Sequence, residues 1–181
     1  MSHYRRANTT AATYFFTVVT YQRRNFLCDD DVRAALREAI IKVRERHPFQ
    51  IDAWVLLPDH LHAIWTLPPG DANFALRWQQ VKRYVTQQCG HRLHKPELMN
   101  ESKRKHREST LWQRRYWEHQ IRDEADYQRH MDYVHYNPVK HGLVARAIDW
   151  PHSSFQRYHA SGVYGENWAT ANKTDDLGFG E

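Results

Sequence analysis

Two apolar runs joined by a two-residue connection constrain the fold more than any other part of the chain. Residues 51–57 are IDAWVLL and residues 60–67 are HLHAIWTL, with only Pro58 and Asp59 between them. A connection this short joins neighbouring antiparallel strands, because a parallel pair needs a much longer crossover. We therefore expect an antiparallel hairpin in the middle of a sheet.

The other periodic segments predict two more strands and three helices. Residues 13–21 (TYFFTVVTY) are rich in β-branched and aromatic side chains, and residues 111–117 (LWQRRYW) have a similar β-like content. Apolar residues recur at helical spacing in residues 29–46, 73–88 and 123–136. The order βαββαβα predicts an α+β fold in which helices flank an antiparallel sheet, close to a ferredoxin-like arrangement.

Glycine and proline set the expected ends of these helices. Gly90 follows the second helix and is expected to terminate it. Pro138 is expected to end the third helix near Asn137, because proline disfavours helical geometry in the residue before it.

Stretches without periodicity suggest how the chain is organised. We expect one domain over residues 1–158, interrupted by a basic loop or insertion at about 95–110. Residues 159–181 are poor in aliphatic side chains and predict a flexible tail.

Composition excludes several classes of protein. The 181 residues contain no apolar run of about 18 residues and open without an apolar segment, so we expect no membrane span or signal peptide and a cytoplasmic location. Cys28 and Cys89 are far apart and form no CxxC pair, which argues against a disulfide framework or a thiolate zinc site. A net charge of +5 suits a polyanionic partner without requiring one.

His60 and His62 flank Leu61 on the second strand of the expected hairpin. Side chains at i and i+2 of a strand point to the same face, about 6.6 Å apart, so both imidazoles can reach one metal ion. The alternative is two partly exposed polar residues on a sheet face, because a chain with 13 histidines contains such a pair by chance quite often.

Tyr133 and Asn137 are four residues apart in the third expected helix. If the helix persists that far, both side chains project from one face and place a phenol beside a carboxamide. The alternative is that the Tyr133 ring packs in the core, as aromatic side chains commonly do.

Aromatic residues alternate with cations at Arg77-Trp78, in residues 82–84 and in residues 115–117. A single-stranded nucleic acid is bound in this way, because its bases stack on flat rings while its phosphates pair with cations. The alternative is that the tryptophans fill the core.

Taken together, several segments resemble the REP-associated tyrosine transposases, a branch of the single-tyrosine HUH transposases and endonucleases. The resemblance extends to about residue 158 through YRR (4–6), AWVLLPDHLHAIWTLP (53–68), FALRWQQVKRY (74–84), WQRRYWEHQIR (112–122), DYQRHMDYVHYNPVKHGLV (126–144) and DWPHSSF (149–155).

The resemblance implies a specific chemistry. It places the paired metal ligands of the family at His60 and His62, a third ligand at Asn137 and the nucleophile at Tyr133. The ion would be Mg²⁺ or Mn²⁺, which suit nitrogen and oxygen ligands without thiolates. The reaction would form a 5′-phosphotyrosine and release a free 3′-OH, without ATP.

The resemblance also implies the partner: single-stranded DNA that folds into REP-type palindromic hairpins. A monomer is expected, although related transposases are dimers. The residues expected to contact DNA are Arg5, Arg6, Trp78, Lys82, Arg114, Arg115 and Trp117. Two alternatives stay open: a protein that binds hairpins without cleaving them, and a metal-dependent nuclease that uses water as its nucleophile.

Overall fold

The computed structural model describes residues 12–168 and contains a four-stranded antiparallel sheet in the order β2-β3-β1-β4. The predicted hairpin is confirmed as β2 (Gln50–Leu56) and β3 (His60–Thr66). β1 (Thr13–Val19) pairs with β3, so β3 is a central strand, and β4 (Trp117–Gln120) pairs with the other side of β1.

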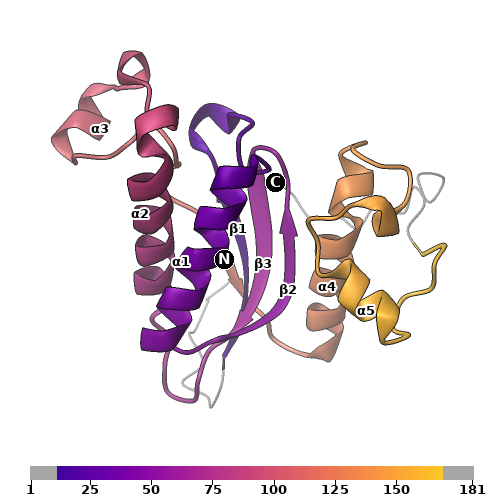
Figure 1. The fold of residues 1–181 in the computed structure, drawn as a ribbon. Coiled ribbons are helices and arrows are strands. Elements are labelled where there is room, and N and C mark those ends of the chain that lie inside the picture. Colours follow the sequence, from indigo (N-terminus) through magenta and orange to yellow (C-terminus); the bar gives the residue numbers. More distant parts are fainter. Residues whose placement is uncertain (1–11, 169–181) are drawn as a thin grey trace, which may run out of the picture.

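Helices cover both faces of this sheet (Figure 1). Helices α1 (Asp30–Arg46) and α2 (Phe74–Leu93) lie on one side, and α4 (Glu124–Lys140) lies on the other. The remaining helical segments are short: η1 (Tyr21–Arg23), η2 (Pro96–Leu98), α3 (Glu101–Lys105), η3 (Ala147–Asp149) and α5 (Phe155–Ala160). The predicted α+β, ferredoxin-like arrangement is confirmed.

Alternation along β1 explains the two layers. Tyr14, Phe16 and Val18 pack into the core beneath α1 and α2, whereas Phe15 packs against α4. Because both faces of the central strands are covered, most of their residues are buried and none is exposed. No helix within residues 12–168 combines the length and the apolar character needed to cross a bilayer.

Gly90 and Pro138, which were predicted to end helices, both lie inside helices, so these two predictions were wrong. α2 continues through Gly90 to Leu93, because Cys89 and Leu93 continue the buried stripe that includes Val85. α4 continues through Pro138 to Lys140, and buried packing of Pro138 and its neighbours outweighs the lost backbone hydrogen bond. Asn137 consequently stays helical, in register with Tyr133.

The last predicted strand was also misplaced. Of residues 111–117, only Trp117 belongs to β4. The preceding residues cross from the α3 region, and Trp112 forms an isolated bridge with Thr20.

The basic segment at 95–110 folds into η2 and α3 (α3 is labelled in Figure 1). Its anchor is Lys103, which is 5% exposed and donates hydrogen bonds to the carbonyl oxygens of Ser109 and Trp112. The ammonium also lies 4.1 Å from the centre of the Tyr21 ring. Lys103, which lies in the segment predicted to be a basic loop, thus holds this segment against the domain.

Part of the expected flexible tail packs against the domain. The predicted boundary at residue 158 lies inside α5, and Tyr164 is buried in a cluster with Phe155 and Val139. The Tyr164 hydroxyl donates to Asp132 on α4. Residues 169–181 lie outside the described part of the chain.

Candidate active site

The histidine pair lies on β3, on the face covered by α4. His60 and His62 are 2% and 1% exposed, and their ring centres are 4.9 Å apart. One nitrogen of each ring has a partner: His60 Nδ1 contacts Asp59 Oδ1 at 2.6 Å, and His62 Nδ1 contacts Thr17 Oγ1 at 2.9 Å. These contacts fix the orientation of both rings and leave both Nε2 atoms for another ligand.

The environment also sets the charge of this pair. Burial lowers the pKa of His62 well below its ordinary value, and neighbouring His60 adds to the effect, so His62 is neutral at pH 7. Burial alone would raise the pKa of Asp59, but the hydrogen bond with His60 and the pairing with Arg23 outweigh it and lower that pKa to about 2. Asp59 is therefore a permanent carboxylate behind His60.

α4 brings Tyr133 and Asn137 to the histidines. The Tyr133 ring is 3% exposed and lies 5.2 Å from the His62 ring. Asn137, one turn later, is fully buried. The structure thus brings together all four residues that the sequence assigned to the site.

The Asn137 side chain lies close enough to His62 to affect its pKa, but several polar atoms here are unsatisfied within the described residues. His60 Nε2, His62 Nε2 and both side-chain polar atoms of Asn137 are buried and make no hydrogen bond of normal geometry within residues 12–168. Leaving such atoms unsatisfied costs free energy, about 1–3 kcal/mol each. Two imidazole nitrogens and a carboxamide oxygen that converge in this way fit a divalent cation with open coordination positions.

Lys140 and His141 lie at the end of α4 beside the site. The Lys140 ammonium is 5.0 Å from the centre of the Tyr133 ring, and the His141 ring is 5.0 Å from the His60 ring. Both side chains are exposed, so they mark the side of the site that faces solvent. The sequence prediction did not include either residue.

A second group, which could itself hold a metal ion, joins α4 to β4. It consists of His119, Asp126 and His130. His119 Nε2 contacts Asp126 Oδ2 at 2.8 Å, and Arg122 also pairs with this carboxylate. His130 stacks on His119 with ring centres 4.7 Å apart.

This second group was not predicted from the sequence, although the sequence contains one weak indication of it. Asp126 and His130 are four residues apart in a helix, which places them on one face. His119 comes from a strand whose pairing the sequence did not predict. Because Asp126 already has several cationic partners, its evident role is to fix α4, and with it Tyr133, against the sheet.

Substitution of Asp126 by asparagine is expected to lower the free energy of unfolding by about 2 kcal/mol at pH 7, because half-buried His119 and the neighbouring Arg122 lose their charged partner. Burial would raise the pKa of Asp126, but hydrogen bonds from His119 and Arg122 outweigh it and lower the pKa. This stabilisation is present above about pH 4, the pKa of an unfolded aspartate, and is lost as pH falls further.

Urea unfolding at pH 7 and pH 3 tests this prediction. The loss of stability on acidification should be smaller in Asp126→Asn than in the wild type, and Glu45→Gln, an exposed change on α1, should behave as the wild type. Equal acid sensitivity of the wild type and Asp126→Asn would count against a paired carboxylate.

The predicted DNA contacts divide into buried and accessible residues. Trp78 is fully buried and stacks on Trp65 at 4.0 Å, so the expectation that it stacks on bases was wrong. Arg115 and Trp117 are accessible, and the Trp117 side chain is 50% exposed. Arg5 and Arg6 lie outside the described residues.

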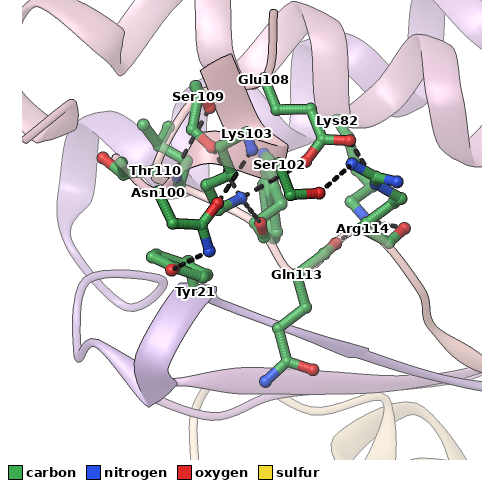
Figure 2. Close-up of polar contacts among 12 residues, drawn as sticks. Tyr21, Lys82, Asn100, Ser102, Lys103, Glu108, Ser109, Thr110, Gln113 and Arg114 are labelled. Carbon is green, nitrogen blue, oxygen red and sulfur yellow. Dashed lines mark hydrogen bonds and ion pairs between the residues drawn. The ribbon is translucent and has the colours of Figure 1, made fainter. Parts of the chain in front are cut away.

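Lys82 and Arg114, which were also predicted to contact DNA, interact with other residues of the protein (Figure 2). Lys82 donates to the carbonyl oxygen of Gln113 at 2.7 Å, and burial lowers its pKa to about 8, helped by Lys103. Arg114 pairs with Glu108 but remains exposed. Both line a groove of about 980 Å³ between α2 and residues 106–116.

Comparisons with known proteins agree with this geometry. Residues 8–137 match the family model described as Transposase IS200 like. A REP-associated tyrosine transposase from Escherichia coli is 46% identical over 93% of this chain and 92% of its own length. A Haemophilus influenzae relative is 42% identical over 93% of both chains. A solved structure of a REP-associated tyrosine transposase bound to a REP hairpin superposes with a TM-score of 0.76 and 43% identity, covering 97% of this chain and 94% of that one.

Proposed function

Because this chain belongs to the IS200-like transposases and, among them, to the REP-associated tyrosine transposases, we propose that it cleaves and rejoins single-stranded DNA at REP-type hairpins through a covalent bond to Tyr133. One observation carries the proposal. The Tyr133 ring lies 5.2 Å from His62, in a buried site where two imidazole Nε2 atoms and a carboxamide make no hydrogen bond of normal geometry within residues 12–168.

The reaction needs no external energy source, because one phosphoester bond forms for each one that breaks. The Tyr133 oxygen attacks the scissile phosphorus, the bond to the 3′ oxygen breaks, and a 5′-phosphotyrosine and a free 3′-OH result. The proton that the phenol loses is matched by the proton that the leaving 3′ oxygen gains. Attack by a 3′-OH on the phosphotyrosine reverses the step and joins strands.

The residues around Tyr133 have supporting roles. When held by His60, His62 and Asn137, Mg²⁺ or Mn²⁺ would stabilise negative charge on the scissile phosphate. Asp59 and Thr17 hold the imidazoles in the orientation that this binding requires. The proposed site is complete within a single copy of the chain, and the expectation that the protein acts as a monomer remains a proposal.

The hairpin is proposed to contact the edge of the sheet next to the site. Trp117 lies on β4, and its exposed ring lies 5.5 Å from Phe15, which in turn contacts the Tyr133 ring. A base stacked on Trp117 would lie close to the nucleophile. Arg115 precedes it and would bind phosphates, as would Arg5 and Arg6. Arg114 and Lys82 already contact Glu108 and the Gln113 oxygen, so they are not proposed as primary phosphate contacts.

A gel assay tests the proposed function. The protein is incubated with labelled single-stranded hairpins and Mn²⁺, then separated under denaturing conditions. A metal-dependent covalent protein–DNA species is the expected result. Cleavage without that species would indicate water as nucleophile, and binding without cleavage would indicate a hairpin-binding protein; either outcome contradicts the proposal.

Lys140→Ala is expected to slow cleavage about tenfold to a hundredfold with hairpin affinity within about threefold of the wild type. The ammonium beside Tyr133 is close enough to stabilise charge that develops on the phosphate. Single-turnover cleavage and fluorescence anisotropy measure the two quantities. Lys105→Ala, an exposed change on α3, is the control, and an equal rate in the two variants would remove this role for Lys140.

A further inference from the structure

A second groove, separate from the candidate active site, runs along the outer edge of β2. It has a volume of about 780 Å³. One wall is a face of α1, and the other is the segment 151–158. This segment follows the strand edge: Leu56 N–H donates to the His152 oxygen, and Ser154 N–H donates to the Trp54 oxygen.

The groove is strongly basic. Arg33, Arg37, Arg44 and Arg157 line it, and Asp52 is the one acidic residue among its described lining. Asp52, which is 6% exposed, offsets one of these charges, and Arg33 also pairs with Asp30 beside the groove, so the excess charge comes from Arg37 and Arg44. The groove therefore presents unbalanced positive charge to a ligand.

Two of these arginines are available for a ligand. Arg37 is exposed and makes no ion pair or hydrogen bond within residues 12–168. Arg44 is also exposed; its Nε donates to the Phe49 oxygen and its guanidinium lies 5.8 Å from the centre of the Phe49 ring, but it forms no ion pair within residues 12–168. They are seven residues apart on α1, which separates their positions by about two turns, or about 10 Å along the groove.

Aromatic side chains lie between the cations. Trp54 and Tyr158 are half-buried in the groove wall, and the Arg157 guanidinium lies 4.9 Å from the centre of the Tyr158 ring. A cationic groove with accessible ring surfaces suits a single strand, whose phosphates and unpaired bases are both available. A duplex would present phosphates but keep its bases stacked within the helix.

One end of the groove adjoins the turn that carries His60. Arg33 donates to the Cys28 oxygen, and Phe26 and Leu27 donate to the oxygen of Pro58 in that turn. A strand that leaves the active site around this turn would meet Arg33 first and then Arg37 and Arg44.

We propose that the groove between α1 and residues 151–158 binds the single-stranded DNA that flanks the cleaved hairpin. This inference rests on the proposed function for its substrate and adds a surface that would hold the strand outside the active site. The groove would thereby distinguish hairpins with a single-stranded extension from hairpins without one.

Binding measurements on a non-cleaving background test the groove without relying on cleavage. Arg37→Ala/Arg44→Ala is combined with Tyr133→Phe and compared with Arg46→Ala/Tyr133→Phe, in which an exposed arginine of α1 outside the groove is removed. The ligands are a hairpin with a single-stranded flank, the same hairpin without it, and unstructured oligothymidylate. Circular dichroism verifies that the exposed substitutions leave the fold intact.

The groove variant should bind the flanked hairpin and oligothymidylate about tenfold more weakly than the control variant does. The slope of log affinity against log salt should fall by about 1.4 for two lost phosphate contacts. Affinity for the unflanked hairpin should stay unchanged. Unchanged affinity for both the flanked hairpin and oligothymidylate would overturn the inference, and equal losses with and without the flank would show that the stem occupies the groove instead.

If no hairpin is bound even by the control variant, the proposed function fails. The affinities of the two variants for oligothymidylate then test the groove independently of the proposed function. A weaker affinity of the groove variant than of the control variant supports single-strand binding by the groove, and an equal affinity rejects it.

Discussion

Tyr133→Phe is expected to reduce DNA cleavage by at least about 10⁴-fold while hairpin affinity stays within about twofold of the wild type. Removal of a covalent nucleophile eliminates the reaction path itself, so the effect is far larger than the loss of one favourable contact. The phenylalanine ring keeps the packing of Tyr133 against Phe15 and His62, and the variant should therefore fold normally.

Single-turnover cleavage with saturating protein separates this effect from binding. Tyr136→Phe is the matched control, because Tyr136 lies on the same helix and packs near the C-terminal cluster rather than in the candidate site. It should cleave at the wild-type rate. Comparable loss in both variants, or cleavage by Tyr133→Phe within about tenfold of the wild type, would exclude Tyr133 as the nucleophile.

His62→Ala is expected to abolish the stabilisation of the protein by Mn²⁺ and to lower cleavage about 10³-fold. At an ion concentration 100 times the Kd, binding to the folded state alone adds about 2.7 kcal/mol to the free energy of unfolding. For a domain of this size that corresponds to a rise in Tm of about 5–10 °C. The wild type should show this rise, and His62→Ala should not.

Thermal unfolding with Mn²⁺ and with EDTA provides this test independently of activity. His91→Ala removes an exposed histidine of α2 and should retain the response. If His62→Ala were stabilised by Mn²⁺ as strongly as the wild type, the ion would be bound elsewhere, and the group of His119, Asp126 and His130 would be the next site to examine.

Local patterns were sufficient to predict most of the sheet. The two-residue connection at Pro58 and Asp59 requires a hairpin, and the run of β-branched and aromatic residues in β1 is typical of a strand. The spacing of His60 and His62 is likewise a local property of a strand. The prediction that Tyr133 and Asn137 share one helix face required the helix to reach Asn137, and α4 continues beyond it to Lys140.

Properties that depend on tertiary contacts were not available from the sequence. Trp78 follows an arginine, as a DNA-stacking residue could, but its burial depends on where Trp65 lies across the core. Lys103 looks like any cation in a basic stretch until the carbonyl oxygens of residues 109 and 112 converge on it. The pairing of His119 with Asp126 similarly requires the register of β4 on β1.

Mapping the protein–DNA bond is the most direct test of the central claim, that Tyr133 is the nucleophile of a strand-joining reaction. The wild type is incubated with a hairpin substrate and Mn²⁺, digested with protease and analysed by mass spectrometry. The account predicts a nucleotide attached through a 5′-phosphate to the peptide that contains Tyr133, and none when EDTA is present. Attachment at Tyr127 or Tyr136, or a cleaved strand with a free 5′-phosphate and no modified peptide, would contradict it.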